Sequence, residues 1–386
     1  MKPRRSAVAA LAVAAFILAF MNRQTIMKGV ISVNAEKYAE FYETGVKFSY
    51  GYDAAPSFYS NSDANFYFCT RNGVKYINAA TGETVWEDVF TMNAPELLYA
   101  GDYVIAGEIG GGTAFVYSPE GRLYEYRFPG AAMSFGVNSS GYSVIIIKTD
   151  DAYETRVIND YGLCVWQFRH KDANIYPVSA AVSPDGRIVA VSMLDANSFL
   201  SSSVFFAYIN SEEAKSYNDT IFASIPKDNQ IVALTRFLGE SFFCLSNAET
   251  GVSRFDAETG LRTNDAAPIE NTIDFAGFFG DKGYALCYGD VLPDKDGRPP
   301  GSLAFFSASG ALLGEWEAGM KATYLSCSKN SVVVGTNRRY FALDSRGKVL
   351  WRYAASRDYK HVVCSNNGAL VIFASSTEAA IMKRGK

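Results

Sequence analysis

The chain has 386 residues, of which 20% are charged, and its formal net charge is −4. This length allows one large domain or two or three ordinary ones. The mild acidic balance argues against the concentrated basic surface that nucleic-acid-binding proteins need.

The first predicted element is an apolar segment behind a basic N-terminus. Lys2, Arg4 and Arg5 precede residues 6–21, which carry no charge. A helix of this length would span about 24 Å, slightly less than the roughly 30 Å hydrocarbon core of a bilayer. Bulky residues stand where a cleavable signal peptide has small ones. We therefore predict an uncleaved signal anchor, a transmembrane helix over residues 1–22.

The charge distribution around this segment predicts its orientation. Because basic residues remain on the cytoplasmic side, everything after residue 22 is expected to be exported. The predicted location is the cell membrane, with a single pass, a stalk over residues 23–44 and an extracytoplasmic C-terminal domain. A cleaved signal peptide and a buried helix of a cytoplasmic protein remain alternatives.

From about residue 45 onward, the chain repeats one hairpin pattern. An aromatic or aliphatic run precedes a polar turn with glycine, and a second run follows. The turn glycines are Gly82, Gly121, Gly162, Gly260, Gly310 and Gly347, and a degenerate unit without glycine falls near Ala214. All four tryptophans, Trp86, Trp166, Trp316 and Trp351, follow such a glycine. Spacings of about 37 to 52 residues are typical of propeller blades with four strands.

The chemistry of the repeat explains its structure. Asp, Asn or Ser followed by Gly closes a tight hairpin, because these residues adopt the dihedral angles that the turn requires. The alternating run before the turn indicates a half-buried strand, and tryptophan after it can fill the wedge between radial sheets. Two further strand-like runs precede each unit. Each unit therefore supplies four antiparallel strands, whose faces a closed ring can bury.

The number of units predicts how the ring closes. Seven complete units cover residues 55–356, and three further strand-like runs lie between residues 361 and 384. A strand at residues 45–50 can supply the missing fourth strand and remove an exposed sheet edge. We predict an all-β fold, an eight-bladed β-propeller of four-stranded antiparallel blades over residues 45–386. Seven blades are the alternative.

These units resemble the quinoprotein-type, pyrroloquinoline-quinone-like propeller repeat. The segment AAVSPDGRIVAVS, residues 180–192, resembles the Ser-Pro-Asp-Gly hairpin of WD40-like and lactonase-like propellers. The similarity covers roughly residues 45–384. The combination of anchor and propeller also resembles an uncharacterised family of membrane-anchored propeller proteins from Firmicute bacteria. The resemblance implies the fold, whereas propellers host many unrelated activities.

The resemblance also implies a chemistry, quinone-dependent dehydrogenation, which requires two adjacent cysteines. The six cysteines, Cys69, Cys164, Cys244, Cys287, Cys327 and Cys364, include no adjacent pair and no CxxC motif. We predict buried free thiols.

The two histidines, His170 and His361, are expected at turns or strand ends, which argues against a catalytic triad. No catalytic, cofactor-binding or metal-binding residue and no cofactor is assigned.

Two predicted loops contain residues that are typical of binding sites. Residues 290–301 hold three aspartates, which could bind calcium, but the spacing does not match an EF-hand. Residues 107–113, GEIGGGT, lack the Lys-Ser/Thr and the helix of a phosphate-binding loop. We predict a solvated hairpin insertion for the first and a hairpin tip for the second.

The predicted function is therefore a non-catalytic, membrane-anchored extracytoplasmic scaffold. It would bind envelope proteins or cell-wall components through its end faces and loops, and no nucleic acid. Residues 177–222 and the loop near Pro293 are the contact candidates, with Phe199, Tyr208 and Tyr217 as anchors or as blade packing.

Two alternatives remain, a lactonase-like extracytoplasmic hydrolase or lyase at the central channel and a glycan-binding sensor. Converging carboxylates with a cation in the channel would indicate the enzyme. A channel lined by small or apolar side chains would indicate the scaffold.

Overall fold

The computed structural model describes residues 41–52, 54, 56–172, 174–197, 201–209, 221–227, 231–239, 241–246, 252–256, 273–280, 282–288, 301–365 and 368–385. Every regular element in this part of the chain is a β-strand, and none of its segments is a helix that could cross a membrane. The predicted fold class included an N-terminal transmembrane helix. The structure corrects this prediction, because the fold that it describes is all-β. Residues 1–22 and most of the predicted stalk lie outside the described residues.

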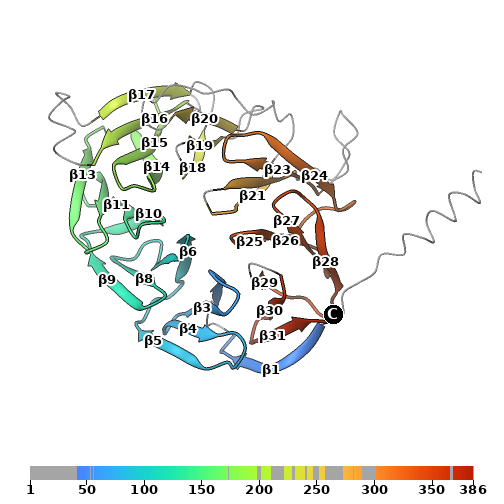
Figure 1. Cartoon of the computed structure of the whole chain (residues 1–386). Helices are drawn as coiled ribbons and strands as arrows, with labels where there is room; N and C mark the ends of the chain where they lie inside the picture. The colour runs from blue at the N-terminus through green and yellow to red at the C-terminus, as the bar shows by residue number, and fades with distance from the viewer. Residues whose placement is uncertain are drawn as a thin grey trace, which may run out of the picture. The chain divides into compact units, whose positions relative to one another are not determined.

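The described strands form antiparallel sheets arranged around a ring (Figure 1). The first four sheets in chain order are β2 (Ser57–Tyr59), β3 (Asn65–Thr70), β4 (Gly73–Asn78), β5 (Thr84–Val89); β6 (Glu96–Ala100), β7 (Tyr103–Gly107), β8 (Thr113–Ser118), β9 (Gly121–Arg127); β10 (Ala131–Val137), β11 (Ser143–Lys148), β12 (Tyr153–Ile158), β13 (Cys164–His170); and β14 (Ile175–Val182), β15 (Ile188–Asp195), β16 (Ser201–Tyr208), β17 (Ile221–Lys227).

The remaining sheets complete the ring. They are β18 (Val232–Leu238), β19 (Ser241–Ser246), β20 (Val252–Asp256); β21 (Ile273–Phe278), β22 (Gly283–Tyr288), β23 (Ser302–Ser307), β24 (Leu312–Glu317); β25 (Tyr324–Cys327), β26 (Ser331–Thr336), β27 (Arg339–Asp344), β28 (Val349–Ala354); and β29 (His361–Cys364), β30 (Leu370–Ala374), β31 (Glu378–Arg384) with β1 (Phe41–Ser49).

The strand count corrects the prediction of eight uniform four-stranded blades. In the described part of the chain, seven sheets have four strands, and the sheet β18–β19–β20 has three. The complete four-stranded blades therefore number seven, and the three-stranded sheet stands in the ring between β14–β17 and β21–β24. Gly260 and Ala214, the turn positions predicted for two of the units, lie outside the described residues.

The two ends of the described chain meet in one sheet. β1 runs antiparallel to β31, with Phe41 opposite Arg384 and Ser49 opposite Glu378. Figure 1 shows β1 beside β31, so the N-terminal strand lies at the outer edge of a sheet whose other strands are C-terminal. The predicted closing strand at residues 45–50 overlaps β1, which begins four residues earlier. Closure gives β31 a partner at the edge that it would otherwise expose.

Large apolar side chains hold neighbouring sheets together, as the tryptophan pattern predicts. Trp86 of β5 donates a hydrogen bond of 2.8 Å to the carbonyl of Pro119 in the next sheet and stacks on Tyr117, with ring centroids 5.5 Å apart. Trp351 of β28 packs edge-on against Phe41 of β1 at 5.2 Å. Trp166 and Trp316 likewise belong to clusters that join two consecutive sheets. Burying these aromatic surfaces between the sheets stabilises the ring.

The turn between β12 and β13 shows why the repeat contains glycine. The Asn159 side-chain oxygen accepts hydrogen bonds from the backbone nitrogens of Tyr161 and Leu163. Gly162 has φ of +80°, a conformation that costs other residues free energy. A Cβ atom at this position would also lie 2.9 Å from Cβ of Tyr124 in the preceding sheet. The glycine therefore serves both the turn and the contact between blades.

Candidate functional site at the central channel

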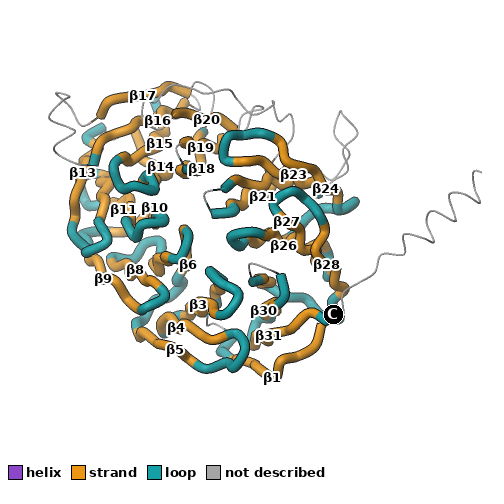
Figure 2. Tube along the Cα trace, in the orientation of Figure 1, coloured by secondary structure: helices purple, strands orange, loops and turns teal. Residues whose placement is uncertain are grey.

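The innermost strand of every sheet contributes to the lining of two cavities at the centre of the ring. One, of about 350 Å³, is lined by residues of β6, β10, β14 and β18 and the loops that follow β10 and β14. The other, of about 370 Å³, is lined by residues of β2, β6, β18, β21, β25 and β29. Figure 2 shows that the labelled strands of these sets face the middle of the ring. We call these spaces the first and the second channel cavity.

Tyr99 and Arg236 line both cavities and connect opposite parts of the ring. The Nη2 atom of Arg236 in β18 donates a hydrogen bond of 3.3 Å to the carbonyl oxygen of Tyr99 in β6. The Tyr99 hydroxyl in turn donates a hydrogen bond of 2.9 Å to the carbonyl oxygen of Cys327 in β25. The Tyr99 ring also stacks on Tyr59, with centroids 3.7 Å apart. We call Tyr99 and Arg236 the crossbar of the channel.

The crossbar carries a positive charge into an aromatic environment. The Arg236 guanidinium lies 4.7 Å from the centroid of the Phe278 ring, a distance suited to a cation–π contact. Burial raises the pKa of the Cys327 thiol to about 12, although the Arg236 charge acts in the opposite direction. Burial likewise raises the pKa of Tyr99 well above its usual value. Tyr99 and Cys327 are therefore neutral at neutral pH, and Arg236 carries the charge.

The remaining lining is small, apolar or hydroxylated. Among the described residues that line the two cavities there is no aspartate or glutamate. Hydroxyl groups come from several residues, among them Ser57, Ser179 and Ser326, an amide comes from Asn138, and an imidazole comes from His361. Burial, and secondarily the charge of Lys360, lowers the pKa of His361, so its neutral form is favoured. The converging carboxylates expected of a channel hydrolase are not among these lining residues.

Four consecutive inner strands share an irregularity that reading the sequence did not reveal. Their pairing with the second strand shifts by one residue, which leaves Met133 of β10, Val178 of β14, Ala233 of β18 and Asp274 of β21 without a directly paired residue. Such β-bulges redirect side chains and are enriched near functional sites. Since the inner strands of a propeller run in the same direction, bulges in their first halves lie at the same end of the channel.

The bulged residues differ in chemistry. Met133 is 42% exposed, Ala233 is exposed and Val178 is half-buried, and the last two line the first channel cavity. Asp274 forms an ion pair of 3.3 Å with Lys321. Met133, Val178 and Ala233 therefore form an apolar set at one end of the channel, which we call the bulge rim.

The predicted contact segment, residues 177–222, is described over residues 177–197, 201–209 and 221–222, and it includes Val178 of the bulge rim. Phe199, Tyr217 and Pro293 lie outside the described residues, as do residues 290–300. Tyr208, at the end of β16, stacks on Phe222 of β17 with centroids 4.4 Å apart, which is packing within a blade. The glycine-rich residues 107–113 connect β7 to β8, as predicted for a hairpin tip.

The predictions for cysteines and histidines were largely confirmed. Cys69, Cys287, Cys327 and Cys364 are buried free thiols. The prediction was wrong for Cys164, which is exposed because it begins β13, the outermost strand of its sheet. The Cys244 side chain lies outside the description. His170 ends β13 and His361 begins β29. In the described chain, no three His, Cys, Asp or Glu side chains are grouped to hold a metal ion.

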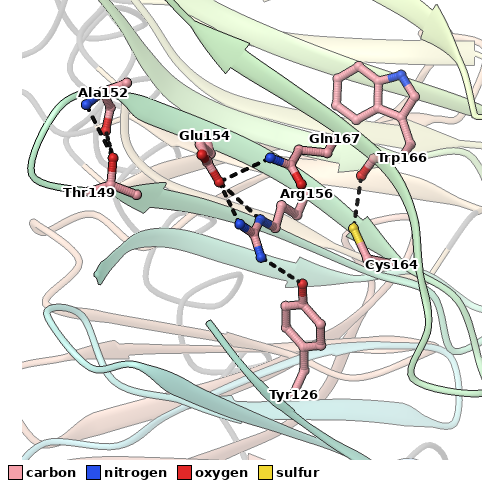
Figure 3. Close-up of polar contacts among 8 residues, drawn as sticks. All are labelled: Tyr126, Thr149, Ala152, Glu154, Arg156, Cys164, Trp166 and Gln167. Atoms are coloured by element: carbon pink, nitrogen blue, oxygen red, sulfur yellow. Dashed lines mark hydrogen bonds and ion pairs between the residues drawn. The ribbon is translucent and has the colours of Figure 1, made fainter. Parts of the chain in front are cut away.

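A separate polar network joins two neighbouring sheets (Figure 3). Arg156 in β12 donates a hydrogen bond of 2.7 Å to Glu154, and a second of 3.1 Å to the Tyr126 hydroxyl in β9. Gln167 in β13 donates to the same carboxylate oxygen at 3.3 Å. The Arg156 and Glu154 side chains are only 16% and 11% exposed. This buried ion pair has the arrangement of a structural contact between blades.

The comparison with family models assigns the chain to a family. A model described as "Family of unknown function (DUF5711)" matches residues 38–383, which include every described strand except the last residue of β31. The chain therefore belongs to this family. No protein in the curated set matches the chain significantly.

Solved structures resemble the chain in fold. The C-terminal WD40 domain of Sif2 is 13% identical, with a TM-score of 0.62, over 91% of this chain and 100% of that domain. A eukaryotic initiation factor is 14% identical, with a TM-score of 0.52, over 83% of this chain and 81% of that one. BamB from Moraxella catarrhalis is 12% identical, with a TM-score of 0.49, over 89% and 100%. The first two support the β-propeller fold, and at this identity they indicate the fold alone.

Proposed function

We propose that this member of the family of unknown function (DUF5711) is a non-catalytic binding protein that docks a partner protein on the bulge rim. The observation that supports the proposal most directly is the repeated bulge at Met133, Val178 and Ala233, which presents apolar side chains at one end of the channel. Exposed apolar side chains beside a cavity are typical of the anchor positions of protein interfaces.

The cavity next to the rim fits this function. The first channel cavity, of about 350 Å³, extends from the bulge residues Val178 and Ala233 to Asn138 and Pro184 at the far ends of β10 and β14. A partner loop could therefore place one or two side chains inside the ring while its flanks cover the rim. Pockets that receive such anchors contribute most of the binding free energy of many interfaces.

We further propose that the ring lies outside the cytoplasm, at the cell membrane, where it would bind an envelope protein. The support comes from the sequence alone, from Lys2, Arg4 and Arg5 followed by the uncharged residues 6–21. Alkaline phosphatase fused to the C-terminus tests this location, because the enzyme is active only after export. An inactive fusion beside an active cytoplasmic reporter at the same position would contradict it.

The docking surface is tested by one substitution on the rim and one elsewhere. Epitope-tagged full-length chain would be purified after cross-linking in its own cells, as wild type, Met133→Glu and Val89→Glu. Val89 is 73% exposed on the outer strand β5, so it is a matched apolar control away from the rim. We expect Met133→Glu to lose a discrete partner at least tenfold and Val89→Glu to retain it. Equal retention by both variants would contradict docking on the rim.

A further inference from the structure

Arg236 is a charged residue in the channel, and its contacts with the described residues use little of its hydrogen-bonding capacity. A guanidinium has five N–H donors. Among the described residues, one hydrogen bond of this side chain is found, to the Tyr99 carbonyl at a rather long 3.3 Å. No carboxylate of the described chain pairs with it, whereas exposed arginines such as Arg338 have such partners. A half-buried cation without a counter-ion is unfavourable, so an anion at this place would be bound favourably.

Arg236 lies in a cavity that has the size of a small-molecule site. The second channel cavity has a volume of about 370 Å³, within the range of ligand pockets. Phe278 holds the guanidinium by a cation–π contact from one side, which limits its movement. Ser57 and Ser326 line the same cavity and can supply further hydrogen bonds. These features provide one fixed positive charge, apolar walls and a few hydroxyl groups.

We propose that the second channel cavity binds a small carboxylate, which pairs with the Arg236 guanidinium. A carboxylate carries one negative charge and matches the planar donor pair of arginine. Inorganic phosphate near neutral pH carries between one and two charges on a tetrahedral group, and proteins usually meet it with several cationic groups. Arg236 is the single cationic side chain among the described lining residues, because burial favours the neutral form of His361. This site is independent of the docking on the bulge rim, and either proposal can fail alone.

Calorimetric titration of the full-length protein tests the chemistry of the ligand. The probes are pentanoate, 1-aminopentane, which has a similar length and opposite charge, and inorganic phosphate. We expect pentanoate to bind with a millimolar or lower dissociation constant, and the other two at least tenfold more weakly. Equal or tighter binding of the amine would overturn the assignment of an anion site, and tighter binding of phosphate would overturn the carboxylate.

Substitutions test the residue. Arg236→Met should weaken pentanoate binding at least tenfold, whereas Arg236→Lys, which keeps the charge without the planar donor pair, should be intermediate. Arg169→Met is the control, because Arg169 is exposed on the outer strand β13. Circular dichroism reports whether each variant folds. Unchanged affinity in a folded Arg236→Met variant would overturn the proposal.

A measurement on the unaltered protein covers the case in which Arg236→Met does not fold. Phenylglyoxal modifies accessible arginines, and mass spectrometry identifies each modified site. We expect pentanoate to slow the modification of Arg236 at least fivefold and to leave Arg169 unaffected. Equal modification rates of Arg236 with and without pentanoate would contradict binding in this cavity.

Discussion

The hydroxyl of Tyr99 donates a hydrogen bond of 2.9 Å to the carbonyl oxygen of Cys327, although 228 residues separate them in the sequence. Tyr99 belongs to the sheet β6–β9 and Cys327 to the sheet β25–β28, so the bond crosses the centre of the ring. Arg236 reaches Tyr99 from a third sheet. The inner strands are therefore connected directly as well as through their neighbours.

Replacing Tyr99 by Phe should lower the stability of the ring. The substitution removes the hydrogen bond to Cys327 and leaves its carbonyl oxygen without this donor, which typically costs about 1 kcal/mol. Urea unfolding followed by tryptophan fluorescence measures the effect. The control is Tyr161→Phe, since Tyr161 is 80% exposed in a turn. Equal unfolding midpoints for both variants would contradict a stabilising role of the crossbar.

Closure of the ring by β1 predicts a second effect. Phe41 packs against Trp351 at 5.2 Å, Tyr353 at 5.2 Å and Phe373 at 5.6 Å. Since Phe41 is half-buried, Phe41→Ala should cost about 2 kcal/mol, less than a fully buried phenylalanine. Limited proteolysis should then cut near β1 first. If Phe41→Ala unfolds at the same urea concentration as Val89→Ala, on an exposed outer strand, the closure is not stabilising.

The buried ion pair of Figure 3 predicts a contrast with surface pairs. Glu154→Gln leaves the Arg156 charge buried without its counter-charge and should cost about 2 to 3 kcal/mol. Asp151→Asn removes the ion pair with Arg169, whose side chains are 84% and 52% exposed, and should cost under about 0.5 kcal/mol. Chemical denaturation of the two variants checks the difference. Similar losses in both would show that the burial of Glu154 and Arg156 has no energetic consequence.

His170 predicts a loss of stability in mild acid. Burial lowers the pKa of its imidazole to about 4, whereas an unfolded histidine titrates near 6.5. As the pH falls from 6.5 to 4, the unfolded state therefore binds a proton that the folded state does not. The contribution of the neutral His170 imidazole to the free energy of unfolding is fully present above pH 6.5, and about 3 kcal/mol of it is lost by pH 4.

His170→Gln should lack this component of the pH dependence. The measurement is the difference in unfolding free energy between wild type and variant at pH 7.0, 5.5 and 4.5. The unfolding free energy of the wild type minus that of the variant should fall as the pH falls, because only the wild type contains the buried imidazole. The other titrating groups are the same in both proteins, so their effects cancel in this difference. A difference that stays constant over this range would contradict a buried neutral imidazole at His170.

The parts of the fold that could be predicted have local signals. The turn at Asn159 and Gly162 contains its hydrogen-bonding side chain and its positive φ within four residues, so the sequence pattern suffices. The place of Trp86 between blades follows from its position after such a turn. The thiol of Cys164 was misplaced because its apolar run resembles a buried strand, whereas β13 is outermost in its sheet.

The channel could not be predicted, because its features depend on pairing and on distant contacts. A bulge at Met133 or Ala233 depends on the register with the next strand, which single-strand periodicity does not reveal. The partner of Arg236 in the crossbar is 137 residues away. The one available signal is an arginine within the mainly apolar strand β18, and such an arginine is equally typical of a solvated position.

Site-specific photo-cross-linking in intact cells tests the proposed docking on the bulge rim most directly. A benzophenone amino acid would replace Met133 in one strain and Val89 in another, both in the full-length chain. The account predicts a discrete cross-linked protein from position 133 and none from position 89. A discrete product from position 89 with none from position 133 would contradict it, because the partner would then bind the outer strands instead of the channel.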